Sequence, residues 1–138
     1  MRFNGRSILA ITALCCAPLP ALAQADYPNK PITLVVPFPP GGVTDIAGRE
    51  AARNLTKYLN QAVVVENKAG AGGNIGTQYL ATSKPDGYTL GLLTVSAMSI
   101  APHVTKNLGF NPSQDFTPIT NVIITEGAIV ANAATPFS

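Results

Sequence analysis

A proline- and glycine-rich turn carries the residue types best suited to bind an anion. It runs from Phe38 to Asp45 and contains Pro40, Gly41, Gly42 and Thr44. An apolar run precedes the turn and a helical pattern follows it. The start of a helix offers unpaired N–H groups and a positive dipole end, and glycines let the main chain approach a ligand closely. The turn therefore predicts an anion site.

The elements on either side of this turn can be read from apolar spacing. Ile32–Val36 is rich in β-branched residues and predicts a strand buried on both faces, as in a parallel sheet. We expect Thr44 to cap a helix that ends near Asn60. Asp45 then either contacts the ligand or only complements the helix dipole, and the sequence leaves both interpretations open.

A second glycine-rich loop follows the apolar run Ala62–Val65, which predicts another buried strand. This loop contains Ala71, Gly72, Gly73 and Asn74. Its glycines are spaced G-x-G-x-x-x-G, one residue longer than the dinucleotide fingerprint, and no acidic residue follows where a ribose contact is needed. Two interpretations remain: a ligand loop with N–H groups and the Asn74 amide facing the solute, or a flexible turn.

The order strand, helix, strand predicts a βαβ unit in an α/β fold with a mostly parallel sheet and flanking helices. A third strand is expected over residues 88–95, and short helices over 76–83 and 97–104. We expect Ile75, Tyr79 and Leu80 to point inward, and one or two further strands over 116–130. Loops at the carboxyl ends of parallel strands line one crevice. Thr94 and Ser96 would supply hydroxyls to that edge.

Catalytic and metal-binding patterns are weak in this chain. His103 is the one histidine, G-x-S-x-G does not occur, and the seven acidic residues are scattered. A nucleophile elbow or a metal centre requires such groups to cluster. The sequence therefore favours a binding protein without a cofactor or metal over an enzyme.

The N-terminus has the layout of a secretory signal peptide. Arg2 and Arg6 form a basic start, Ile8–Ala17 is apolar but too short to span a membrane, and Ala21-Leu22-Ala23 is a small-residue cleavage site. We expect cleavage after Ala23 and export.

Removal of the signal changes the composition. Cys15 and Cys16 leave with it, and Leu14 before Cys15 argues against a lipid anchor. Seven basic residues then balance seven acidic ones, so the whole-chain charge of +2 predicts neither nucleic-acid nor membrane binding.

Five ordered blocks resemble the extracytoplasmic solute receptors of tripartite tricarboxylate transporters, the Bug (TctC-type) family. The blocks are Tyr27–Ile32, Val36–Asp45, Val64–Gly76, Pro85–Leu90 and Asp115–Ile119. The resemblance implies a monomeric periplasmic-binding-protein-like clamshell of two α/β domains that closes on a small carboxylated solute and delivers it to membrane permease subunits. It also implies a carboxylate held by backbone N–H groups and water, at Pro40–Asp45 and Ala71–Asn74, with Thr94 and Ser96 lining the cleft.

The resemblance also implies a domain organisation. Residues 24–120 would form the N-terminal part of the first domain, incomplete in this chain, and residues 121–138 would cross toward a second domain. The segment Leu93–Met98 is more apolar than in the family, which bears on the third loop. Two alternatives stay open: a truncated, non-functional relic of such a receptor, or part of a periplasmic α/β enzyme acting on a carboxylate or phosphate ester.

Overall fold

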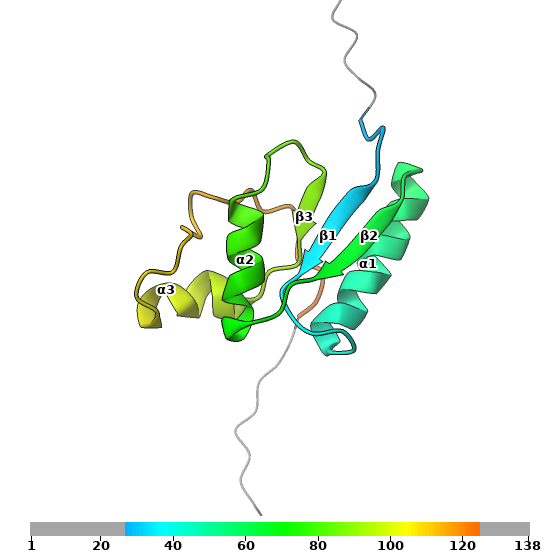
Figure 1. Cartoon of the computed structure of the whole chain (residues 1–138). Helices are drawn as coiled ribbons and strands as arrows, with labels where there is room; N and C mark the ends of the chain where they lie inside the picture. Colours follow the sequence, from blue (N-terminus) through cyan, green and yellow to red (C-terminus); the bar gives the residue numbers. More distant parts are fainter. Residues whose placement is uncertain (1–26, 125–138) are drawn as a thin grey trace, which may run out of the picture.

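A three-stranded parallel sheet forms the centre of the computed structural model, which describes residues 27–124 (Figure 1). The strands lie in the order β2-β1-β3, with bounds β1 Ile32–Val36, β2 Val63–Asn67 and β3 Thr89–Gly91. Both neighbouring pairs are parallel: Ile32 lies opposite Val63, and Thr33 lies opposite Thr89. The predicted α/β fold with a parallel sheet is confirmed.

Helical segments connect the strands and follow the last of them. They are α1 Val43–Leu59, the 3₁₀ turn η1 Ala71–Gly73, α2 Asn74–Ala81, the π-helical turn η2 Ser96–Ile100 and α3 Ala101–Val104. The order β1-α1-β2 confirms the predicted βαβ unit. The short helix expected over 97–104 is present as η2 continued by α3.

Helices α1 and α2 cover opposite faces of the sheet. A Cβ placed on Gly48 of α1 would meet Val36, whereas one placed on Gly91 would meet Leu80 of α2. Gly91 pairs with Val35, and successive strand residues point to opposite faces. Strand β1 is consequently covered on both sides, and its Ile32, Val35 and Val36 are 0% exposed.

Two details of α1 follow from its ends. The helix begins at Val43 with Gly42 as its N-cap, so the expectation that Thr44 caps it is wrong. Gly42 is extended and carries no side chain, and it leaves the first turn without a side-chain cap. At the other end, Asn60 adopts the left-handed conformation with φ 51°, which confirms the predicted stop.

The edges of the sheet depart from the sequence prediction. Val64 in β2 is 56% exposed, because β2 is an edge strand and the described residues leave its α2-side face partly open. The third strand is limited to Thr89–Gly91. Helix α2 begins at Asn74, and Ile75 and Tyr79 are 53% and 42% exposed rather than inward.

The predicted extra strands are wrong over Phe116–Ile124, the part that the structure describes, where no strand forms. The remainder of that prediction and the expected signal segment lie outside the described residues.

Candidate ligand-binding site

Three loops meet at the carboxyl edge of the sheet, as the sequence predicted. The first follows β1, the second follows β2 and contains η1, and the third follows β3 and enters η2 (Figure 1). Loops one and two touch: a Cβ on Gly73 would lie 3.2 Å from the Phe38 ring. Turn η1 also packs against η2. The topology therefore brings the candidate residues of all three segments to one edge.

The first loop delivers the start of α1 to this edge. Gly41 has φ +87°, a left-handed conformation that suits glycine, and Pro40, Gly41 and Gly42 are exposed. The first backbone bond of the helix runs from the Ile46 N–H to the Gly42 carbonyl. No side chain caps the helix, so its first N–H groups remain open to an external acceptor.

The second loop is a left-handed turn that delivers the start of α2. Ala71, Gly72 and Gly73 have φ of +47°, +66° and +99° in succession. Positive φ is costly for alanine and concentrates at functional positions. Gly73 is the N-cap of α2 and no side chain caps this helix either, while Asn74 is its half-buried first residue. Two uncapped helix starts thus lie at the same edge.

The third segment places Thr94 and Ser96 unequally. Ser96 is exposed and opens η2. The Thr94 hydroxyl is buried and has no hydrogen-bond partner among the described residues. A buried hydroxyl without a partner is uncommon in proteins, and an unbound ligand or water is one of its ordinary explanations.

Asp45 lies beneath the first loop and is 2% exposed. Its Oδ2 accepts hydrogen bonds from the Gly41 N–H and from Arg49 Nε, both at 2.9 Å. Its Oδ1 accepts one from Asn67 Nδ2 at 2.8 Å. Both carboxylate oxygens are therefore engaged within the chain. A ligand contact by the Asp45 side chain stays a prediction, and this geometry does not favour it.

Arg49 and Asn67 are the site residues that sequence reasoning missed. The Arg49 side chain is 54% exposed on α1, yet its guanidinium turns back onto Asp45. The available signal was the (i, i+4) spacing of an acid and an arginine at a helix start. Asn67 is the last residue of β2, and its signal was a polar side chain two residues after the apolar run Ala62–Val65.

This environment predicts how acid affects the fold. The Arg49 guanidinium, the Gly41 N–H and the Asn67 amide hold the pKa of the Asp45 carboxyl well below its usual range. Because the pKa is lower in the folded state, Asp45 contributes its full stabilisation above about pH 5, and this contribution is lost progressively as pH falls below that value. Urea unfolding of wild type and Asp45→Asn at several pH values measures it. The wild-type midpoint should fall more steeply below pH ~4 than that of the variant, and parallel curves would contradict the assignment.

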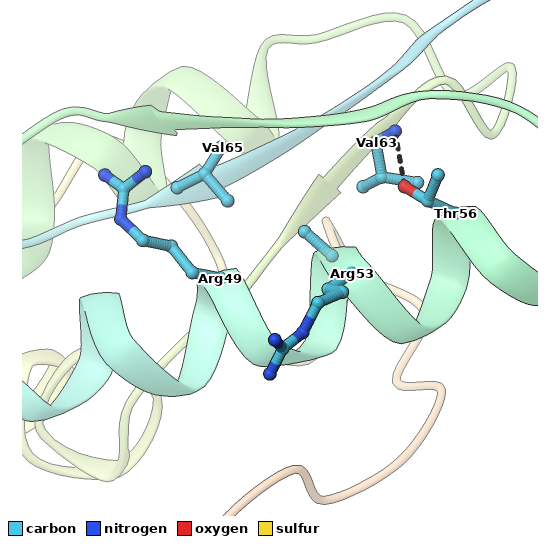
Figure 2. A pocket seen from close by; sticks show the side chains of 6 residues that line it. Arg49, Arg53, Thr56, Val63 and Val65 are labelled. Atoms are coloured by element: carbon cyan, nitrogen blue, oxygen red, sulfur yellow. Dashed lines mark hydrogen bonds between the residues drawn. The ribbon is translucent and has the colours of Figure 1, made fainter.

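Two hollows in the described part of the chain lie away from the three loops. The first, of about 330 Å³, is an open groove between α1 and β2 lined by Ala52, Val63 and Val65, with Arg49 and Arg53 at its rim (Figure 2). The Val63 N–H donates to Thr56 Oγ1 at 3.0 Å beside it. Both arginines are engaged, Arg49 by Asp45 and Arg53 by Glu50. The groove therefore offers no free cation for an anion.

The second hollow, of about 470 Å³, lies at the opposite edge of the sheet, near the start of β1. Lys30 there lies 4.1 Å above the Tyr88 ring and 3.5 Å from Asp86. Within residues 27–124, no group of three or more metal-ligand side chains gathers, and no helix has the length and apolar character to cross a membrane.

An open parallel sheet whose glycine-rich loops converge at its carboxyl edge is typical of a ligand-binding α/β domain. The chain also matches the receptor family of the tripartite tricarboxylate transporters over residues 47–138. It belongs to this family, which confirms the resemblance seen in the sequence.

Known relatives place the fold among periplasmic binding proteins. The chain is 43% identical to protein BugT of Bordetella pertussis over 86% of its own length and 38% of that protein. It is 46% identical to the periplasmic binding protein BugD, with a TM-score of 0.64 over 67% of this chain and 31% of BugD. MatC of Rhodopseudomonas palustris, solved with bound malate, is 36% identical with a TM-score of 0.64, covering 67% of this chain and 31% of MatC. An R. palustris protein solved with adipate is 36% identical, with a TM-score of 0.61 over 64% of this chain and 29% of that one. The chain thus spans between a quarter and two fifths of the proteins that it matches.

Proposed function

We propose that the full-length gene product is a periplasmic receptor that binds a small organic acid with two or three carboxylates and presents it to membrane permease subunits. The observation that carries the proposal is the convergence of two uncapped helix starts at one sheet edge. Helix N-termini bind anions through free N–H groups and the helix dipole. Malate and adipate in two structural relatives support a dicarboxylate as the anion.

In this proposal the ligand contacts are mostly main-chain groups. One carboxylate is bound by the first loop and the second loop, with the Thr94 and Ser96 hydroxyls beside them. The contacting residues are Phe38, Pro40, Gly41, Gly42, Thr44, Asp45, Ala71, Gly72, Gly73, Asn74, Thr94 and Ser96. The backbone N–H of Val43, the first residue of α1, lies within the same stretch and joins them. Asp45 takes part through its backbone N–H, since its carboxylate is engaged internally. The Thr94 hydroxyl, which finds no hydrogen-bond partner within residues 27–124, supports a polar ligand or water at this edge.

The proposed receptor acts as a monomer, without catalysis and without a cofactor. Residues 24–120 supply one wall of its cleft, and residues 121–138 lead toward a second domain. This division follows from the family resemblance, and the matched relatives are long enough for two domains of ordinary size.

Isothermal titration calorimetry of the full-length gene product tests the function. The panel contains malate, adipate, succinate and citrate, with glucose and lysine as uncharged and cationic controls. We expect at least one carboxylate to bind with a dissociation constant near 1 μM or below, about 8 kcal/mol of binding free energy. The absence of binding by every carboxylate, or turnover of a bound one, would contradict the proposal.

Export is a separate prediction of the same proposal. The basic, apolar and small-residue order of residues 1–23 predicts removal of the signal after Ala23. N-terminal sequencing of the protein from a periplasmic extract should therefore begin at Gln24. A protein that retains Met1 and stays in the cytoplasm would contradict it.

A further inference from the structure

One part-buried polar network joins the end of β2 to the first loop. Asn67 Nδ2 donates to the Phe38 carbonyl at 3.0 Å and to Asp45 Oδ1 at 2.8 Å. Its Oδ1 accepts from Arg49 Nη2 at 3.2 Å. These bonds connect positions 18, 22 and 29 residues apart. A single amide therefore links the strand that leads into the second loop with both ends of the first.

The chemistry of the network calls for an amide at position 67. The side chain must donate to two oxygens and accept from a guanidinium, and asparagine has both functions within one short group. Aspartate would bring a second carboxylate against Asp45. Alanine would leave the Phe38 carbonyl and Asp45 Oδ1 without this donor in a part-buried place, which is costly.

Asp45 connects the Asn67 amide to the exposed part of the first loop. Its Oδ2 holds the Gly41 N–H, and Gly41 has φ +87°. Glycine populates many backbone conformations when free, so without this bond the loop has alternatives to the observed one. A binding-competent loop that is only partly populated weakens apparent affinity in proportion to its population.

We propose that Asn67 is a positioning residue which, together with Arg49, couples the second strand to the first loop through Asp45 and sets the loop for the ligand before it arrives. The inference rests on the proposed function for its effect on ligand affinity. Its effect on loop order is independent of any ligand.

The first test is hydrogen exchange at the Gly41 amide in the ligand-free full-length protein. Asn67→Ala should speed exchange at Gly41 by about tenfold or more. The reason is that the Asp45 carboxylate, which accepts from the Gly41 N–H, loses the Asn67 amide that helps to orient it. Arg53→Ala is the matched control: Arg53 lies one turn further along α1, and its guanidinium pairs with Glu50 rather than with Asp45 or Asn67. Unchanged Gly41 exchange in Asn67→Ala would overturn the coupling, whether or not a ligand has been found.

The second test measures the malate affinity of wild type and variants by calorimetry, at a temperature well below the unfolding midpoint of each protein. Asn67→Ala should raise the dissociation constant about tenfold or more, and Arg53→Ala should leave it unchanged. Arg49→Lys keeps the charge but loses the two-pronged contact, and since Arg49 is half-exposed this variant folds even if Asn67→Ala does not. It should raise the constant several-fold.

A swapped pair separates positioning from general loss of stability. Asp45→Asn combined with Asn67→Asp restores the donor–acceptor pair and the single charge between the two positions but leaves the Phe38 carbonyl without this donor. The double variant should therefore bind malate more tightly than Asn67→Asp alone, which sets two carboxylates against each other. Binding by the double variant no tighter than by Asn67→Asp, or wild-type affinity in Arg49→Lys, would overturn the proposal. Failure of wild type to bind any carboxylate would refute the proposed function instead, and the Gly41 exchange still decides the coupling.

Discussion

Gly76→Ala should destabilise the protein by about 1–3 kcal/mol, although alanine normally favours a helix over glycine by about 1 kcal/mol. Gly76 lies in the first turn of α2, where the helix packs directly against the main chain of Pro37 and Lys68. A Cβ there would lie 2.7 Å from the Lys68 carbonyl oxygen and 2.8 Å from the Pro37 Cα. Both are main-chain atoms, which cannot rotate away as a side chain can. The free-energy cost of the steric clash therefore exceeds the gain in helix propensity from replacing glycine by alanine.

Equilibrium unfolding in urea measures this effect, with Gly42→Ala as the control. Gly42 is extended, and the nearest atom to a Cβ there is the Pro39 carbonyl oxygen at 3.8 Å. The control should cost less than about 1 kcal/mol, since it only replaces a glycine cap by alanine. A Gly76→Ala protein as stable as wild type would contradict the close packing of the two loops.

The architecture follows from sequence patterns because its determinants are local. The β-branched run Ile32–Val36 predicts a strand covered on both faces, and the structure places it in the middle of the sheet. The glycine-rich loops predict sharp turns into helices, and both helices begin at the loops. Parallel pairing then brings these loops to one edge without further information.

The predictions that failed depend on what lies across the fold. Val64 reads as a buried strand residue, but its exposure depends on whether a neighbouring element covers β2. Threonine is a good N-cap residue, which favours Thr44 from sequence alone, but the helix begins earlier and its N-cap is Gly42, two residues before Thr44. Asn67 meets Asp45 across 22 residues, and no local pattern records that contact.

Val43→Pro should weaken carboxylate binding about 10- to 150-fold, the value of one hydrogen bond to a charged group at 1.5–3 kcal/mol. Val43 is the first residue of α1, where proline is well tolerated because its missing N–H has no partner within the helix. Gly42, with φ −77° and ψ 167°, already has the extended conformation that a residue before proline requires. The substitution thus removes one N–H group and leaves the helix intact.

Val43→Ala is the matched control for this substitution. The Val43 side chain is 68% exposed, so its removal costs little packing, and the backbone N–H is retained. A thermal melt of both variants should give midpoints close to wild type, which establishes that any change in affinity comes from the lost donor.

In the proposed site, main-chain N–H groups at the start of α1 bind the carboxylate. Calorimetric titration of the full-length Val43→Pro and Val43→Ala proteins with the tightest-binding carboxylate tests it most directly. We expect wild-type affinity for Val43→Ala and at least tenfold weaker binding for Val43→Pro. Equal affinities in the two variants would contradict it.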